Sequence, residues 1–277
     1  MTGSESIAHA LHEAMTNNSS IHVLGEALPL SGAAAPLLSA HPGQCHLLPA
    51  SDATLVGTAV GIAMSGARAV VELSGPEALW GAIQQIGQEA ASLHGEFQST
   101  LVIRVPLTPD SPNPLPLFDG LDHIRVVSPA SPADAGVLIQ AALDSPGITV
   151  VLEPLTILSE AGGISGEARL GSASIATEGD HVTIAAWGDG VSAAHRAARS
   201  LSTEGISAEV IDLRSLSPLD SSTLQASVHK TGRIVVVNGS PEIMQTITEQ
   251  AFLRLESPPA NASTDQILSM ARAAVHY

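Results

Sequence analysis

The chain has little of several residue types, and each shortage excludes a class of protein. Cys45 is the only cysteine among 277 residues, so no internal disulfide can form, and we expect a reducing, cytoplasmic location. The chain has 11 Lys and Arg residues against 27 Asp and Glu residues, and no segment concentrates the Lys and Arg residues into a basic patch. Nucleic acid and anionic membrane surfaces are therefore not expected partners.

Long hydrophobic runs are also absent. The longest nearly apolar window, Leu55 to Met64, contains Gly57, Thr58 and Gly61 and is too short to cross a bilayer. The first 20 residues lack the basic segment and apolar run of a secretory signal. We therefore expect no targeting or membrane segment.

Aromatic residues make up only 2% of the chain, whereas 44% of the residues are hydrophobic. A core of Ala, Val, Ile and Leu suits helices packed tightly on a sheet. The length is sufficient for two ordinary domains, each with a core of its own.

Apolar strands alternate with helical patterns along the chain. Residues 1–158 contain helical patterns at 5–16, 53–67, 77–94 and 131–144, separated by apolar segments such as "AVVEL", "TLVIRVP" and "ITVVLEP". Strands that are apolar throughout indicate a parallel sheet covered on both faces. After a Gly-rich linker at 159–174, residues 175–277 repeat the pattern. We predict an α/β fold of two domains, each a mostly parallel sheet with helices on both faces.

One acid, Asp52, stands in the run "LLPASDATLVG", where a loop becomes a buried helix. Either Asp52 or Ser51 is a suitable helix cap, because both residue types accept hydrogen bonds from the free amides of a first turn. A Gly-Asp-Gly turn at 187–191, "WGDGV", is predicted to follow a strand, and no Asn follows it before Asn238.

Two segments of the second half are distinctive, "GISAEVIDLRSLSPLD" and "KTGRIVVVN", and they follow "VLGEAL", "VGTAVGIAMSGARAVVEL", "TLVIRVP" and "VVLEP" in the first half. In these segments and their order, the sequence resembles the beta subunit of the decarboxylating component of 2-oxo acid dehydrogenase complexes. This resemblance implies a transketolase-like fold: a pyrimidine-binding domain at 1–158 and a shortened transketolase C-terminal-like domain at 175–277.

The resemblance also implies a cofactor, thiamine diphosphate, shared with an alpha chain that holds the diphosphate and Mg²⁺; this chain itself is expected to hold no metal. An α2β2 heterotetramer and contact with an acyl-carrier protein are implied as well. Asp52 matches a family glutamate that hydrogen-bonds the cofactor's aminopyrimidine ring, so it is the predicted catalytic residue. Glu26, Ala50, Ala78 and Trp80 are the other residues predicted to contact the cofactor.

Several departures from the family keep alternatives open. Ala78 replaces an aromatic residue, and Trp80 is either its substitute or a core residue. The loop at 107–120, "LTPDSPNPLPLFDG", lacks the family's histidine, and neither His123 nor His46 is an obvious replacement. Its four prolines predict a stiff, extended segment.

Two functions fit these residues. The first is the beta component of an enzyme that decarboxylates a 2-oxo acid and transfers the acyl or hydroxyalkyl unit, as a dehydrogenase component or a specialised carboligase does. The second is a catalytically reduced paralogue that serves as a structural or regulatory partner of an alpha chain.

Overall fold

The computed structural model describes residues 1–26, 34–48, 51–91, 100–162 and 169–277. The chain divides into two compact units, unit 1 from Met1 to Leu170 and unit 2 from Gly171 to Tyr277. Among the described residues, every helix is too short or too polar to cross a bilayer.

Unit 1 is built on a parallel sheet. Its strand order is β5-β6-β4-β3-β1-β2, and all of these strands pair in parallel. The strands are β1 (Ile21–Gly25), β2 (Cys45–Leu47), β3 (Arg68–Glu72), β4 (Thr100–Leu107), β5 (Ile124–Val127) and β6 (Gly147–Pro154). The central strands are buried along nearly their whole length, as the apolar segments predict.

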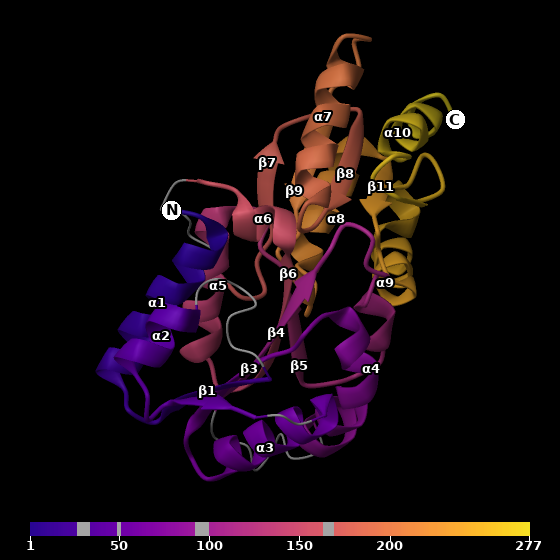
Figure 1. Cartoon of the computed structure of the whole chain (residues 1–277). Helices are drawn as coiled ribbons and strands as arrows, with labels where there is room; N and C mark the ends of the chain where they lie inside the picture. Colours follow the sequence, from indigo (N-terminus) through magenta and orange to yellow (C-terminus); the bar gives the residue numbers. More distant parts are fainter. Residues whose placement is uncertain (27–33, 49–50, 92–99, 163–168) are drawn as a thin grey trace. The chain divides into compact units, whose positions relative to one another are not determined.

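Helices cover both faces of this sheet (Figure 1). On one face lie α1 (Gly3–Asn17), α2 (Ala34–Ala40), α5 (Pro132–Leu143) and α6 (Leu155–Ser159). On the other lie α3 (Asp52–Met64), α4 (Pro76–Gln84) and a π-helical segment, Gln85–Ala90. The first helix begins at a capping box in which Thr2 and Glu5 bond each other's backbone amides.

The structure adds elements that the sequence pattern missed. The strand β2 and the helices α2 and α6 are short, and such segments carry little periodicity. The loop at 107–120 is not extended throughout, because Leu115–Leu117 forms a 3₁₀ turn and both Leu115 and Phe118 are buried. Part of this loop therefore belongs to the core of unit 1.

Unit 2 repeats the architecture on a smaller sheet of order β12-β11-β8-β9-β7. All neighbours pair in parallel except β7, which is antiparallel to β9. The strands of this sheet are β7 (Ser174–Thr177), β8 (Val182–Ala186), β9 (Ala208–Asp212), β11 (Ile234–Val237) and β12 (Ala260–Ala262), and the short strand β10 (Ser215–Ser217) lies outside it. The helices are α7 (Gly190–Ser202), α8 (Ser221–Thr231), α9 (Pro241–Ala251) and α10 (Ile267–Val275), with a 3₁₀ turn at Phe252–Arg254. The predicted α/β class, mostly parallel with helices on both faces, is confirmed.

The start of α8 is held by a carboxylate. Asp220 accepts hydrogen bonds from the Thr223 amide at 3.1 Å, from the Ser222 and Thr223 hydroxyls at 2.7 Å each, and from the Ala173 amide at 3.0 Å. Burial alone would raise the pKa of Asp220, but these bonds outweigh it and lower the pKa to about 2. The charged form of Asp220 therefore stabilises the fold.

Replacing Asp220 with Ala is expected to lower the free energy of unfolding at pH 7 by about 1 kcal/mol. Because the folded-state pKa lies below the ordinary value of 3.8, this stabilisation is present above pH 4 and disappears as the pH falls towards about 2. Urea denaturation at pH 7 and pH 2.5 measures the difference. Asp220→Asn is the control, since it keeps an acceptor oxygen without the charge. A deficit in Asp220→Ala that is the same at both pH values would contradict the expectation.

Candidate functional site

The carboxyl edge of the unit 1 sheet is where a ligand site is expected, because open parallel sheets bind ligands outside the carboxyl ends of their strands. Gly25 at the end of β1 pairs with Glu72 at the end of β3 and with Leu47 at the end of β2. The helix α2, which follows β1, and the helix α4, which follows β3, lie on opposite faces of the sheet (Figure 1). Two of the predicted site residues, Glu26 and Asp52, lie in the segments that leave this edge.

Asp52 is the first residue of α3, and Ser51 is its cap. The Ser51 hydroxyl accepts a hydrogen bond from the Thr54 amide at 3.4 Å. The Asp52 carboxylate is partly exposed, and no hydrogen bond or ion pair joins it to any residue within the described ranges. Of the two possible caps, the structure selects Ser51, so the Asp52 carboxylate is available for another role.

A glycine faces this carboxylate across the α3–α4 contact. The Asp52 Oδ2 atom lies 3.4 Å from the position that a Cβ atom would take at Gly81. Any side chain at Gly81 would therefore touch the carboxylate and cover it. With glycine there, the space on one side of the Asp52 carboxylate stays open.

The other predicted contact residues are placed very differently. Trp80 lies in α4 beside Gly81 with 65% of its surface exposed, so the core interpretation of Trp80 is wrong. Ala78 is buried at 4%, and Glu26 is exposed directly after β1. Ala50 lies outside the described residues. A cofactor contact by any of these residues stays a prediction.

A buried ionic cluster crosses the sheet next to this edge, and the sequence analysis missed it. The guanidinium of Arg104 in β4 donates to Glu153 in β6 at 2.8 and 2.9 Å, and to Glu72 in β3 at 2.7 Å. All three residues are at most 5% exposed. Burial alone would lower the pKa of Arg104, but the two carboxylates raise it, so the guanidinium stays charged.

One signal could have revealed this cluster. Glu72, Arg104 and Glu153 are the single charged residues in three otherwise apolar strand segments, "AVVEL", "TLVIRVP" and "ITVVLEP". Buried charges need partners, so three such strands in one sheet indicate mutual pairing. The cluster joins β3, β4 and β6 at the edge that carries the candidate site.

The two histidines weighed for the loop at 107–120 do not lie in that loop. His46 is in β2, where its Nε2 atom is 3.1 Å from Nδ1 of His22 in β1. Burial and the neighbouring His46 lower the pKa of His22. His123 is exposed in the turn before β5, with a φ of 67°.

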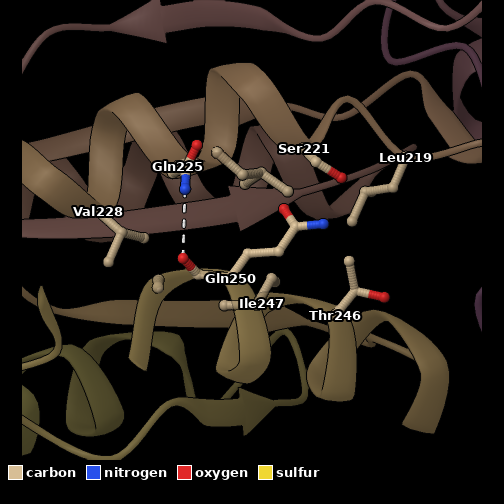
Figure 2. A pocket seen from close by; sticks show the side chains of 9 residues that line it. Leu219, Ser221, Gln225, Val228, Thr246, Ile247 and Gln250 are labelled. Carbon is tan, nitrogen blue, oxygen red and sulfur yellow. Dashed lines mark hydrogen bonds between the residues drawn. The ribbon is translucent and has the colours of Figure 1, made fainter. Parts of the chain in front are cut away.

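Two features of unit 2 are the glycine-rich turn predicted at 187–191 and a small pocket between two helices. "WGDGV" is a turn after β8, as predicted, closed by a hydrogen bond from the Gly190 amide to the Trp187 carbonyl at 3.0 Å. Figure 2 shows a pocket between α8 and α9, where the Gln225 amide donates to the Gln250 carbonyl at 3.3 Å. Its free volume of about 10 Å³ has room for only about one water molecule.

The chain is similar to known proteins over nearly its whole length. Residues 171–276 match the family model described as transketolase, C-terminal domain. The pyruvate dehydrogenase E1 component subunit beta of Acholeplasma laidlawii is 30% identical over 300 residues, covering 99% of this chain and 92% of the relative. The acetoin:2,6-dichlorophenolindophenol oxidoreductase subunit beta of Cupriavidus necator is 31% identical, covering 91% and 85%. A solved structure, a split-gene transketolase described as an inactive beta4 tetramer, superposes with a TM-score of 0.87 at 20% identity and covers 100% of this chain and 98% of the other.

Proposed function

Because the chain belongs to the family of pyruvate dehydrogenase E1 beta subunits, we propose that it is the beta component of a two-chain, thiamine diphosphate-dependent enzyme that decarboxylates a 2-oxo acid and transfers the remaining acyl or hydroxyalkyl unit. The observation that carries the proposal is the Asp52 carboxylate, which has no hydrogen-bond partner within the described residues and faces the open side of Gly81.

The residues around Asp52 fit an aminopyrimidine ring. A ring nitrogen needs a carboxylate that can share a proton with it, and a carboxylate without partners in the protein has all of its acceptor sites for the ring. Ser51 supplies the helix cap, which leaves both oxygens of Asp52 for the ring. Thiamine diphosphate, when bound, supplies the electron sink that allows a 2-oxo acid to lose carbon dioxide. Asp52 holds the proton at the ring, and Glu26, Ala50, Ala78 and Trp80 complete the proposed contact surface.

An alpha chain is proposed to supply the diphosphate and Mg²⁺ site, in an α2β2 heterotetramer. The chain has no Asn within the usual distance after its Gly-Asp-Gly turn, so it lacks that metal-diphosphate signature. The relatives are themselves named as beta subunits, and the similar split-gene transketolase is described as inactive when it is a tetramer of beta chains. The exposed position of Trp80, in α4 beside Gly81, agrees with a half-site that a second chain completes.

The acceptor of the transferred unit is proposed to differ from the usual lipoyl group. The loop at 107–120 contains no histidine, and its Leu115 and Phe118 are packed into unit 1. A general acid for acyl transfer to a lipoyl arm is therefore missing from this loop. The relative named for acetoin oxidation shows that members of this family are not confined to pyruvate dehydrogenase.

Titration calorimetry with thiamine diphosphate and Mg²⁺ tests the proposal, using this chain, its candidate alpha chain and their mixture. We expect binding by the mixture alone, with a Kd of about 10⁻⁶ M or lower. Gel filtration of the same samples is the control for assembly. A complex that assembles but binds no cofactor would contradict the enzymatic proposal and favour the second candidate, a structural partner of an alpha chain. The observation that supports this second candidate is Ala78, a small buried residue where the family has an aromatic one.

A further inference from the structure

Arginine side chains gather around one hollow in unit 2, although the chain as a whole is strongly acidic. The hollow has a volume of about 560 Å³ and lies where α7 and α10 pack together. Its lining comprises Arg196, Arg199, Ser200, Thr203, Glu204, Leu268 and Arg272. The whole chain has only 11 Lys and Arg residues and a net charge of −16, so three arginines around one hollow are a marked local excess.

Only one of these arginines is neutralised. The Arg272 guanidinium donates from Nε to the Glu204 carboxylate at 2.8 Å and from Nη2 to the other oxygen of that carboxylate. Arg196 and Arg199 have no acidic partner among the described residues, and both are exposed on α7. Three guanidinium groups against one carboxylate leave two positive charges at the hollow.

The hydroxyl groups in the lining are not free donors. Ser200 donates to the Arg196 carbonyl at 3.2 Å, and Thr203 donates to the Ser200 carbonyl at 2.7 Å. The available side-chain N–H groups are therefore those of the guanidinium forks. Such a set of donors selects an anion with several oxygen atoms over a neutral polar ligand.

We infer that this hollow binds the dianionic phosphate group of a small metabolite. The two uncompensated charges of Arg196 and Arg199 match a phosphate monoester near pH 7, whose terminal oxygens accept hydrogen bonds from guanidinium groups. A carboxylate offers one charge and two oxygens, which is a poorer match. The hollow is shallow and widely open to solvent, so the organic part of the ester can extend out of it.

Calorimetric titration of the full chain with inorganic phosphate and pyrophosphate, at constant ionic strength, tests this site. We expect saturable binding of phosphate at millimolar concentration or below and weaker binding of acetate. Arg196→Gln is expected to weaken phosphate binding about tenfold or more. Arg254→Gln is the matched control, because Arg254 is also exposed, has no partner in the described part of the chain, and its replacement removes the same charge. It is expected to leave phosphate binding unchanged.

Three results would overturn the inference: no saturable phosphate binding up to about 10 mM, equal weakening by Arg196→Gln and Arg254→Gln, or tighter binding of a poly-glutamate peptide than of phosphate at equal charge. The second result would mean that only the overall charge matters, and the third would make the hollow a docking site for an acidic segment. The titration uses this chain without an alpha chain or thiamine diphosphate, so it is independent of the proposed function.

Discussion

Replacing Asp52 with Ala is expected to lower kcat of the complex between this chain and its alpha chain by about 10²- to 10⁴-fold, the usual contribution of a positioned acid–base group. The carboxylate lies at the start of α3 without a partner in the described residues, so its removal breaks no recorded bond of the fold. The effect is therefore expected in turnover, whereas assembly and the free energy of unfolding change little. Asp52→Asn keeps the shape and loses the charge, and it is expected to be similarly impaired.

Ser51→Ala is the matched control, because it removes the neighbouring side chain that does cap the helix. Its expected effect is the reverse: a loss of about 0.5–1 kcal/mol of stability with turnover unchanged. Steady-state kinetics of the reconstituted complex and urea denaturation of each variant measure both quantities. Full activity in Asp52→Ala would refute the role proposed for the carboxylate.

Asp52→Glu distinguishes an adapted site from a degenerate one. The extra methylene moves the carboxylate by roughly 1.5 Å, more than a hydrogen bond tolerates. If the backbone of α3 already brings Asp52 close enough to the ring, glutamate is too long and lowers turnover. If the site has decayed from a glutamate ancestor, glutamate restores part of the activity. Urea denaturation of Asp52→Glu is the control, because a variant that clashes with α4 would also lose stability.

Asp52 could be singled out from the sequence because it is one acid in an apolar run, and the alternation of apolar strands and helices was enough to predict the sheet architecture. The sequence could not decide between Ser51 and Asp52 as the cap, because both residue types suit that position and the choice depends on the φ and ψ angles at one residue. The exposure of Trp80 was not predictable either, since it depends on which face of α4 packs on the sheet.

The buried cluster of Glu72, Arg104 and Glu153 shows a second limit of the sequence. The residues are 32 and 49 positions apart, and their pairing depends on the strand order, which places β4 between β3 and β6. The strands themselves were predicted, but the neighbours of each strand were not. A pattern local to one strand cannot reveal which other strand supplies the opposite charge.

Replacing Arg104 with Met is expected to destabilise the chain by about 3–5 kcal/mol at pH 7, because it leaves the carboxylates of Glu72 and Glu153 buried without their cation. A domain is commonly stable by only about 5–15 kcal/mol, so this variant is expected to unfold in much less urea than the wild type. The matched control combines Glu72→Leu, Arg104→Met and Glu153→Leu. It removes every charge from the cluster and is expected to recover most of the loss.

The pH dependence of the same variant shows whether unpaired charge is the cause. In Arg104→Met, the two buried carboxylates have lost the guanidinium that balanced their charge, so burial favours their neutral, protonated forms in the folded state. The folded variant then takes up protons as the pH falls from 7 towards 5, so its deficit relative to the wild type shrinks over that range. Urea denaturation at both pH values provides the measurement. A deficit in the free energy of unfolding that stays constant between pH 7 and pH 5 would mean that the loss comes from packing alone. A variant as stable as the wild type at pH 7 would show that the cluster does not stabilise this edge of the sheet.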